Sequence, residues 1–164
     1  MVELRMRYEM KPVQDKGWAV REDASFAGLY RMSPVRRVEM VREGAPAELL
    51  NTVAERTGMA REELYRALGL APSTIKRKLS RHQHLSSDES ERAMGIVRLI
   101  GQVAAMLEES SDEQDFDAAA WLGRWLARPN PALGGERPLD YLDTADGRQM
   151  VSDLLGRMQS GAYS

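Results

Sequence analysis

The sequence contains no cysteine, and its only histidines are His82 and His84. The absence of cysteine excludes disulfides and sites that depend on a thiol. Because the two histidines have no carboxylate pair near them, we expect no metal site. The chain also lacks a glycine-rich nucleotide-binding motif, a phosphate-binding loop and a nucleophile elbow. We therefore predict that the protein is not an enzyme and uses no cofactor.

Long apolar runs are missing as well. No segment approaches the ~20 consecutive apolar residues that a membrane-spanning helix requires. The first seven residues, MVELRMR, lack the apolar core of a signal peptide. Hydrophobic residues make up 43% and charged residues 29% of the chain, which is typical of a globular protein. We expect a cytoplasmic protein with one domain, or two small units that share a core.

The net charge of −2 hides an uneven distribution. Residues 33–84 carry ten lysines and arginines against six acidic residues, whereas residues 85–164 carry seven against fourteen. A basic middle followed by an acidic end indicates two surfaces with different partners. Solvated faces that simply differ in charge remain the alternative explanation.

Turn and capping signals divide the first half of the chain. Residues 1–32 show no sustained periodicity, and we expect an extension that covers an exposed edge of the core. Ser33 and Pro34 predict the start of a helix that ends at Gly44. Its three valines, Val35, Val38 and Val41, are expected to face inward. Further helices are predicted over Pro46–Gly58, Ala60–Leu68 and Pro72–His82.

The last two of these helices form a helix-turn-helix signature around Gly69. The second helix begins with short polar side chains and continues with cations, which suits a helix that enters the major groove of DNA. Tyr65 replaces the small residue usual at its position, so its ring should tilt outward or spread the helices. A helix-turn-helix kept only as an assembly scaffold therefore remains an alternative. The predicted DNA-binding residues are Ser73, Thr74, Lys76, Arg77, Lys78 and Arg81.

Residues 86–110 are predicted to form the longest helix, capped by Ser86 or Ser87. Apolar side chains cover most of its circumference, so we expect a buried helix at the centre of the molecule that links the two halves. The same helix is a candidate homodimer interface. Its narrow polar stripe consists of Glu91, Arg98, Gln102 and Glu109.

The last quarter of the chain is predicted to contain the end of a helix, a tight loop, a short helix and an amphipathic helix. Pro129 and Pro131 stop the helix that carries Trp121 and Trp125, and two glycines permit a sharp turn. Asp143 or Thr144 is expected to cap the final helix, which Gly161 closes. The apolar residues of that helix, Met150, Val151, Leu154, Leu155 and Met158, share one face.

The run WLARPNPALGGERPLDYL, followed by GRQMVSDLLGRMQSGAY, resembles the toxin-binding domain of Xre/ParS/MbcA-type antitoxins. The prolines, the paired glycines and the Gly-x-Tyr ending occur together and in the family's order. The resemblance implies the antitoxin of a type II toxin–antitoxin pair, which neutralises a RES-domain toxin that degrades or consumes NAD. DNA binding would then serve autoregulation, in which the antitoxin, alone or in complex with its toxin, represses its own operon. The alternative is a free-standing helix-turn-helix transcription regulator.

This resemblance places the toxin contact on the final helix and the tail. Packing of the apolar stripe against the protein's own core is the alternative for that stripe. The tail is expected to project into the toxin's pocket, with a frayed end as its alternative. The predicted toxin-binding residues are Arg148, Met150, Leu154, Arg157, Met158, Gly161, Ala162, Tyr163 and Ser164.

The whole prediction is an all-α protein with an N-terminal half that resembles Xre/Cro-like helix-turn-helix proteins. We expect an extension over residues 1–32, a helix-turn-helix domain over 33–85 and a linking helix over 86–110. A small toxin-binding domain with its tail should occupy residues 111–164.

Overall fold

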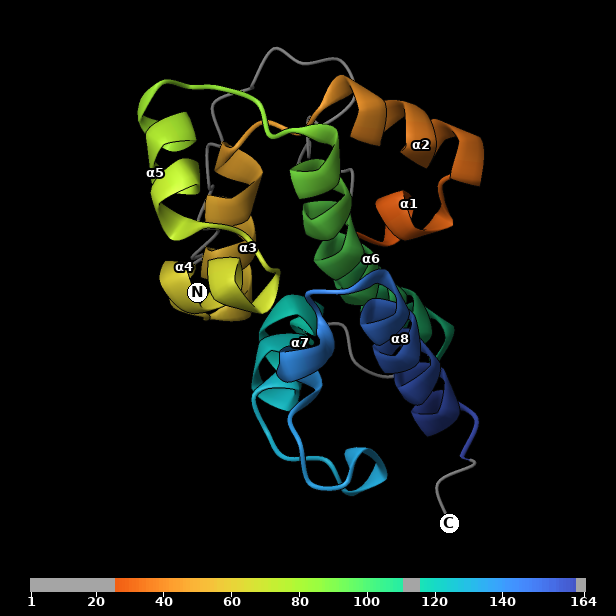
Figure 1. Cartoon of the computed structure of the whole chain (residues 1–164). Helices are drawn as coiled ribbons and strands as arrows, with labels where there is room; N and C mark the ends of the chain where they lie inside the picture. Colours follow the sequence, from red (N-terminus) through yellow and green to blue (C-terminus); the bar gives the residue numbers. More distant parts are fainter. Residues whose placement is uncertain (1–25, 111–115, 162–164) are drawn as a thin grey trace, which may run out of the picture.

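The chain folds into helices over the residues that the structure, a computed structural model, describes: 26–110 and 116–161. This part contains eight α-helices, two short 3-10 helices and no strand, which confirms the predicted all-α class. None of these helices is long and apolar enough to cross a membrane. The elements in Figure 1 are α1 (Phe26–Arg31), α2 (Pro34–Glu43), α3 (Glu48–Thr57), α4 (Arg61–Ala67), α5 (Pro72–Ser80), α6 (Ser87–Ser110), α7 (Ala118–Leu126), η1 (Pro131–Leu133), η2 (Pro138–Tyr141) and α8 (Ala145–Gln159).

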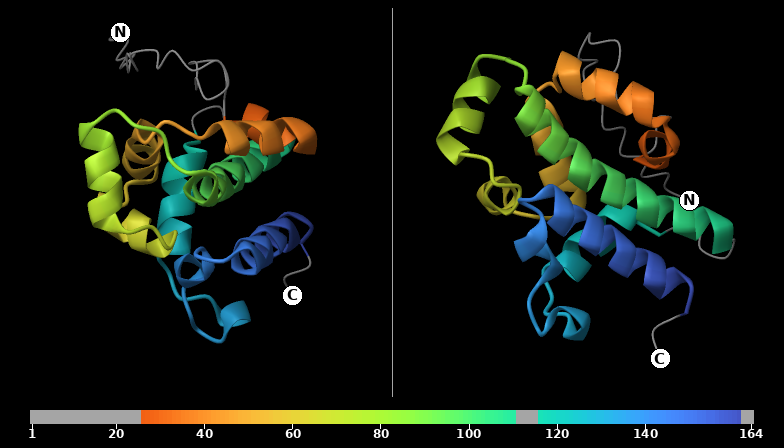
Figure 2. Two further views of the ribbon diagram at one scale, coloured as in Figure 1. Left: turned by 45° about the horizontal axis from the view of Figure 1, so that its top comes forward. Right: turned by 45° about the vertical axis from the view of Figure 1, so that its right-hand side comes forward.

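The 24-residue helix α6 runs through the centre of the molecule (Figure 1, Figure 2). Helices α1, α2, α3, α7 and α8 pack around it, and Ile96 and Ile100 are completely buried. A capping box starts the helix: Ser86 N donates to the Glu89 carboxylate at 2.8 Å, and Glu89 N donates to the Ser86 hydroxyl at 3.1 Å. The predicted buried central helix is confirmed, and its apolar side chains pack within this chain.

One member of the predicted polar stripe on α6 is buried. Gln102 is only 6% exposed. Its amide nitrogen donates to the Ser152 carbonyl at 2.9 Å, and its amide oxygen accepts from the Ser152 hydroxyl at 2.7 Å. A glutamine can leave solvent when its donor and acceptor are both paired. Gln102 therefore joins α6 to α8, so this member of the polar stripe is buried between two helices.

Helix α1 packs closely on α6. Phe26 and Leu29 are buried, and a Cβ placed on Gly101 of α6 would overlap the carbonyl oxygen of Phe26. Only a glycine allows two helix backbones to approach this closely. The described end of the N-terminal segment thus covers one side of the central helix. The rest of the predicted extension, residues 1–25, lies outside the described residues.

Helix α2 has the predicted ends but a different buried face. The Ser33 hydroxyl caps it, and Gly44 ends it. Val35 and Val38 were predicted to face inward, yet they are 69% and 46% exposed, whereas Met40 is completely buried. Because three residues turn an α-helix by only about 300°, valines spaced three apart drift around the helix and do not form one stripe.

Helix α3 begins at Glu48, two residues after the predicted Pro46. The residues before it pair with the segment that leads into α6. Pro46 forms an isolated antiparallel bridge with His84, and Ala47 N donates to the Gln83 carbonyl at 3.2 Å. This pairing holds the two connections together and delays the start of the helix.

The helix-turn-helix consists of α4 and α5. Gly69 adopts a φ of 69° in the turn, where a residue with a Cβ would be strained. Tyr65 does not tilt outward: it is 1% exposed, and this burial raises the pKa of its hydroxyl. Helix α5 ends at Ser80, two residues before the predicted end, and His82 follows with a φ of 50°.

The C-terminal half has the predicted order of elements. Helix α7 ends at Leu126, before the two prolines, and Gly134 and Gly135 turn the chain with φ values of 65° and 89°. The Thr144 hydroxyl caps α8 by accepting from Gly147 N at 3.0 Å. The loop around η1 extends away from the other helices (Figure 1). After this loop the chain turns back, so that α8 packs against α6.

Candidate functional site

The predicted DNA-binding residues lie on α5 and just beyond its end, at the edge of the molecule (Figure 1). Thr74 and Lys78 are half-buried. Arg77 and Arg81 make no ion pair within the described part of the chain, so their guanidinium groups are available to a ligand. The structure exposes four of the six predicted residues: Ser73, Lys76, Arg77 and Arg81.

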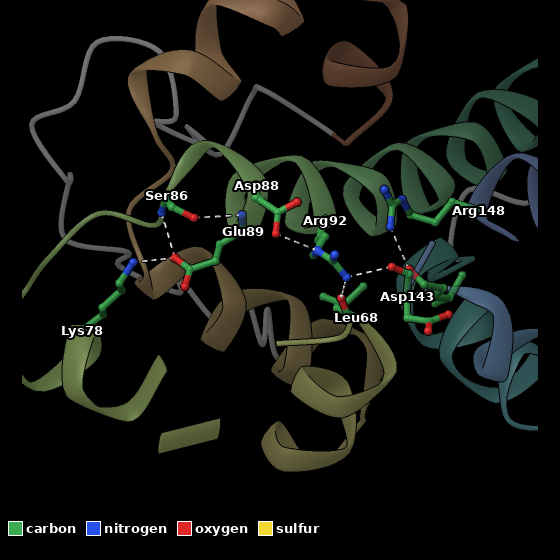
Figure 3. Close-up of polar contacts among 9 residues, drawn as sticks. Leu68, Lys78, Ser86, Asp88, Glu89, Arg92, Asp143 and Arg148 are labelled. Carbon is green, nitrogen blue, oxygen red and sulfur yellow. Dashed lines mark hydrogen bonds and ion pairs between the residues drawn. The ribbon is translucent and has the colours of Figure 1, made fainter. Parts of the chain in front are cut away.

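Lys78 is engaged inside the protein and not directed to solvent. Its ammonium pairs with the Glu89 carboxylate at 2.5 Å, and the two side chains are only 16% and 17% exposed (Figure 3). Although burial opposes it, the hydrogen bonds from Lys78 and from the Ser86 backbone lower the pKa of Glu89. The pair therefore ties α5 to the start of α6, and Lys78 positions the helix.

Lys76 has an acidic neighbour that lies on the other helix of the pair. Its ammonium contacts the Glu62 carboxylate of α4 at 2.5 Å, and the hydrogen bond from Lys76 lowers the pKa of Glu62. Both side chains are well exposed, at 60% and 48%. Exposed pairs of this kind are weak, so Lys76 can exchange Glu62 for another anion.

Two residues predicted to contact a toxin belong to the core or its edge. Leu154 is 1% exposed, so it packs inside the protein as the alternative explanation held. Arg148 was predicted to contact a toxin, but it is half-buried and donates to the Leu142 carbonyl at 2.9 Å. Its side chain lies across Gly95 of α6, and burial lowers its pKa. Met150 is also half-buried.

The exposed members of the predicted set gather at the C-terminal end of α8. Met158 is 39% exposed, and Arg157 and Gly161 are also exposed. Gly161 has a φ of 66° and ends the helix as predicted. The tail residues Ala162, Tyr163 and Ser164 lie outside the described residues. The structure thus separates the predicted surface into a buried part and an accessible end.

Arg92 is a connecting residue that sequence reasoning missed. Its guanidinium donates to the Leu68 carbonyl at 3.1 Å, to the Asp143 carbonyl at 2.7 Å and to the Asp88 carboxylate at 3.1 Å (Figure 3). It therefore connects α6 to the turn between α4 and α5 and to the residue that precedes the N-cap of α8. The acceptors in the first two bonds are main-chain groups 24 and 51 residues away, which no local pattern reveals.

We expect Arg92→Ala to lower the free energy of unfolding by about 1–3 kcal/mol, because two carbonyl groups lose a charged donor. Arg92→Lys should restore only part of this, since an ammonium does not reproduce the planar fork of a guanidinium. Urea unfolding followed by circular dichroism measures both effects. Arg128→Ala removes an exposed arginine and serves as the control. Equal stability of Arg92→Ala and the control would show that the bonds contribute nothing.

The two tryptophans of α7 stack on each other. The rings of Trp121 and Trp125 lie 6.0 Å apart at 12°, and Phe116 lies 6.3 Å from Trp121. Both tryptophans are half-buried, so they share one partly covered face of α7. This aromatic strip borders the core, and its outer edges reach the surface.

Two surfaces thus stand out at different ends of the molecule: the basic face of α5 and the exposed end of α8 (Figure 1). Within residues 26–110 and 116–161, no group of three or more potential ligand side chains is arranged to hold a metal ion. The fold and these surfaces define an all-α helix-turn-helix protein with a second surface on its C-terminal helices.

Comparison with known proteins identifies both halves. Residues 36–98 match the antitoxin Xre-like helix-turn-helix domain, and residues 113–161 match the antitoxin Xre/MbcA/ParS C-terminal toxin-binding domain. A protein of Sphingobium sp. (strain YBL2), named "Prs ADP-ribosylating antitoxin", is 39% identical over 140 residues, which cover 85% of this chain and 88% of the relative. The antitoxin Xre of Photorhabdus laumondii is 26% identical over 125 residues, covering 76% and 79%.

The chain therefore belongs to the Xre/MbcA/ParS family of antitoxins. It is a type II antitoxin with a helix-turn-helix domain and a C-terminal toxin-binding domain, as the resemblance in the sequence predicted.

Proposed function

We propose that this antitoxin neutralises a RES-type toxin that consumes NAD, by covering the toxin's active site with its C-terminal helices. The match of residues 113–161 to the toxin-binding domain carries the proposal. The accessible end of α8, with Arg157 and Met158, lies within that range and directly precedes the tail. A pocket that holds the phosphates of NAD needs basic groups, and the acidic C-terminal half of this chain would be attracted to it.

The chemistry of the toxin is proposed from one relative. The Sphingobium protein is named a "Prs ADP-ribosylating antitoxin". ADP-ribosyl transfer uses NAD as the donor and releases nicotinamide. We infer that the toxin paired with this antitoxin transfers ADP-ribose from NAD to an acceptor, which distinguishes it from a toxin that only hydrolyses or phosphorolyses NAD.

Expression of the chain together with its flanking genes tests the proposal. A partner from a neighbouring reading frame should co-purify with the antitoxin, and cellular NAD should collapse when the antitoxin gene alone is omitted. Labelled NAD should then leave its ADP-ribose on a macromolecule. Steady NAD and no co-purifying partner would favour the free-standing transcription regulator instead.

The second part of the proposal is that a homodimer represses its own operon through α5. Two copies of α5 about 34 Å apart would read the two halves of a palindromic operator. Because the apolar side chains of α6 are buried inside this chain, the dimer contact would use another surface. The exposed cations of α5 support contact with DNA phosphates.

Arg77→Ala combined with Arg81→Ala should weaken operator binding by at least about tenfold. The number of phosphate contacts derived from the salt dependence of the affinity should fall by about two. The reason is that both side chains are exposed and have no ion-pair partner among the described residues, so each can replace a counterion. Electrophoretic mobility shifts at several salt concentrations provide the measurement. Arg128→Ala, on the far loop, is the matched control. Unchanged affinity of the double variant would assign DNA binding to another surface.

A further inference from the structure

A cavity of about 560 Å³ lies between α2, α6 and α8. In the right-hand view of Figure 2, α2 and α8 flank α6 on opposite sides. Residues of all three helices line the cavity. Its volume is within the range of roughly 300–1,000 Å³ typical of small-molecule sites. It is separate from the face of α5 and from the exposed end of α8.

The cavity wall is strongly basic. Arg37, Arg42, Arg98 and Arg148 line it, and among the described residues Glu91 is the only carboxylate in the lining. Burial lowers the pKa of Arg148, and the negative charge of Glu91 partly opposes this effect. Neither Arg37 nor Arg98 forms an ion pair with a carboxylate in the described part of the chain. As far as residues 26–110 and 116–161 go, the end of the cavity near these two arginines therefore holds uncompensated positive charge.

Arg37 is held in position by the main chain. Its guanidinium donates to the carbonyl oxygens of Tyr30 and Met32, so it cannot turn away from the cavity without losing these bonds. Burial, and then the neighbouring charge of Arg98, lower the pKa of Arg37. Two guanidinium groups that repel each other at one wall are stabilised by an anion that accepts hydrogen bonds from both.

The rest of the wall is largely apolar. Val41, Met94 and Leu99 line it beside the arginines, and Tyr30 contributes the edge towards α1. Ligand sites typically combine such an apolar lining with a few polar groups that fix orientation. A ligand with a charged head and an apolar or aromatic body matches both parts of this wall.

We propose that the cavity between α2, α6 and α8 binds a small organic anion, with its phosphate or carboxylate between Arg37 and Arg98 and its body against Met94 and Leu99. The ligand bridges a helix of the helix-turn-helix half and the helix that carries the toxin-binding surface. The planar guanidinium group of arginine donates paired hydrogen bonds to phosphate and carboxylate groups, which supports this choice of ligand.

Titration of the full chain with 1-anilinonaphthalene-8-sulfonate, an anion with an aromatic body, tests the site. We expect saturable fluorescence with one probe per chain, displaced by adenosine monophosphate or by octanoate but not by adenosine. Arg98→Glu should weaken the probe at least about tenfold, because it replaces a charged donor by a repelling carboxylate. Arg98 is chosen because its side chain is exposed and makes no hydrogen bond or ion pair within residues 26–110 and 116–161.

Arg128→Glu makes the same charge change on the distant loop and should leave the probe's affinity unchanged. Equal binding by Arg98→Glu and the native chain, displacement by adenosine as well as by the anions, or no saturable binding would overturn the proposal.

Discussion

Replacement of Gly123 by alanine is expected to lower the free energy of unfolding by about 3 kcal/mol, the upper part of the usual range for overpacking. A Cβ at this position of α7 would overlap the carbonyl oxygen of Thr57, at the end of α3. That oxygen belongs to the backbone, and the Thr57 side chain is itself buried and bonded to the Val53 carbonyl at 2.7 Å. Relief of the overlap therefore requires α7 to move away from the core.

Two other helical glycines provide matched controls. Gly156 has only the Gln102 side-chain nitrogen near its Cβ direction, at 4.0 Å, so Gly156→Ala should raise stability by up to about 1 kcal/mol through helix propensity. Gly95→Ala would meet the Arg148 side chain, which can shift, and should fall between the other two. Urea unfolding of the three variants measures the order. A Gly123→Ala chain within about 0.5 kcal/mol of the native chain would contradict the close backbone contact.

Capping and turn residues that act locally explain why the helix ends were predictable. The Ser33 cap, the left-handed Gly58 and Gly69, and the prolines after α7 each act on their own backbone within one turn. Such residues determine where a helix begins or ends whatever packs against it. The order of the helices and the all-α class follow from these signals together with helical periodicity.

Contacts between distant segments explain the errors. Gln102 is buried because Ser152 completes its hydrogen bonds, and Arg148 is held by the Leu142 carbonyl across Gly95. Their polarity alone predicts exposure, and only the fold supplies the partner. The cavity between α2 and α8 is of the same kind, since its arginines come from three helices that the sequence does not place together.

The candidate toxin surface was only partly predictable for a related reason. An apolar stripe on an amphipathic helix has the same spacing whether it packs on the protein's own core or on a partner. The structure separates the two uses: Leu154 is buried at 1% exposure, and Met158 remains 39% exposed at the end of α8. The accessible end of the helix is therefore the part of the stripe on which a partner can bind.

Met158→Asp is expected to weaken the complex with the toxin by about 30-fold to 100-fold, because a partner that covers this position would bury an unpaired carboxylate. Removal of residues 162–164 should act differently. If the tail fills the toxin's pocket, its loss abolishes protection of NAD while the affinity falls less. Isothermal titration calorimetry gives the affinity, and NAD consumption by the purified toxin gives the protection.

Val38→Asp is the control, since Val38 is also an exposed apolar residue, at 46% exposure, and it lies on α2 outside the toxin-binding match. It should leave the complex unchanged, and thermal unfolding should show that both aspartate variants remain folded. Similar losses from Val38→Asp and Met158→Asp would place the toxin contact elsewhere. Full protection by the shortened chain would show that the covering helices block the active site without the tail, so steric closure by α8 alone would account for neutralisation.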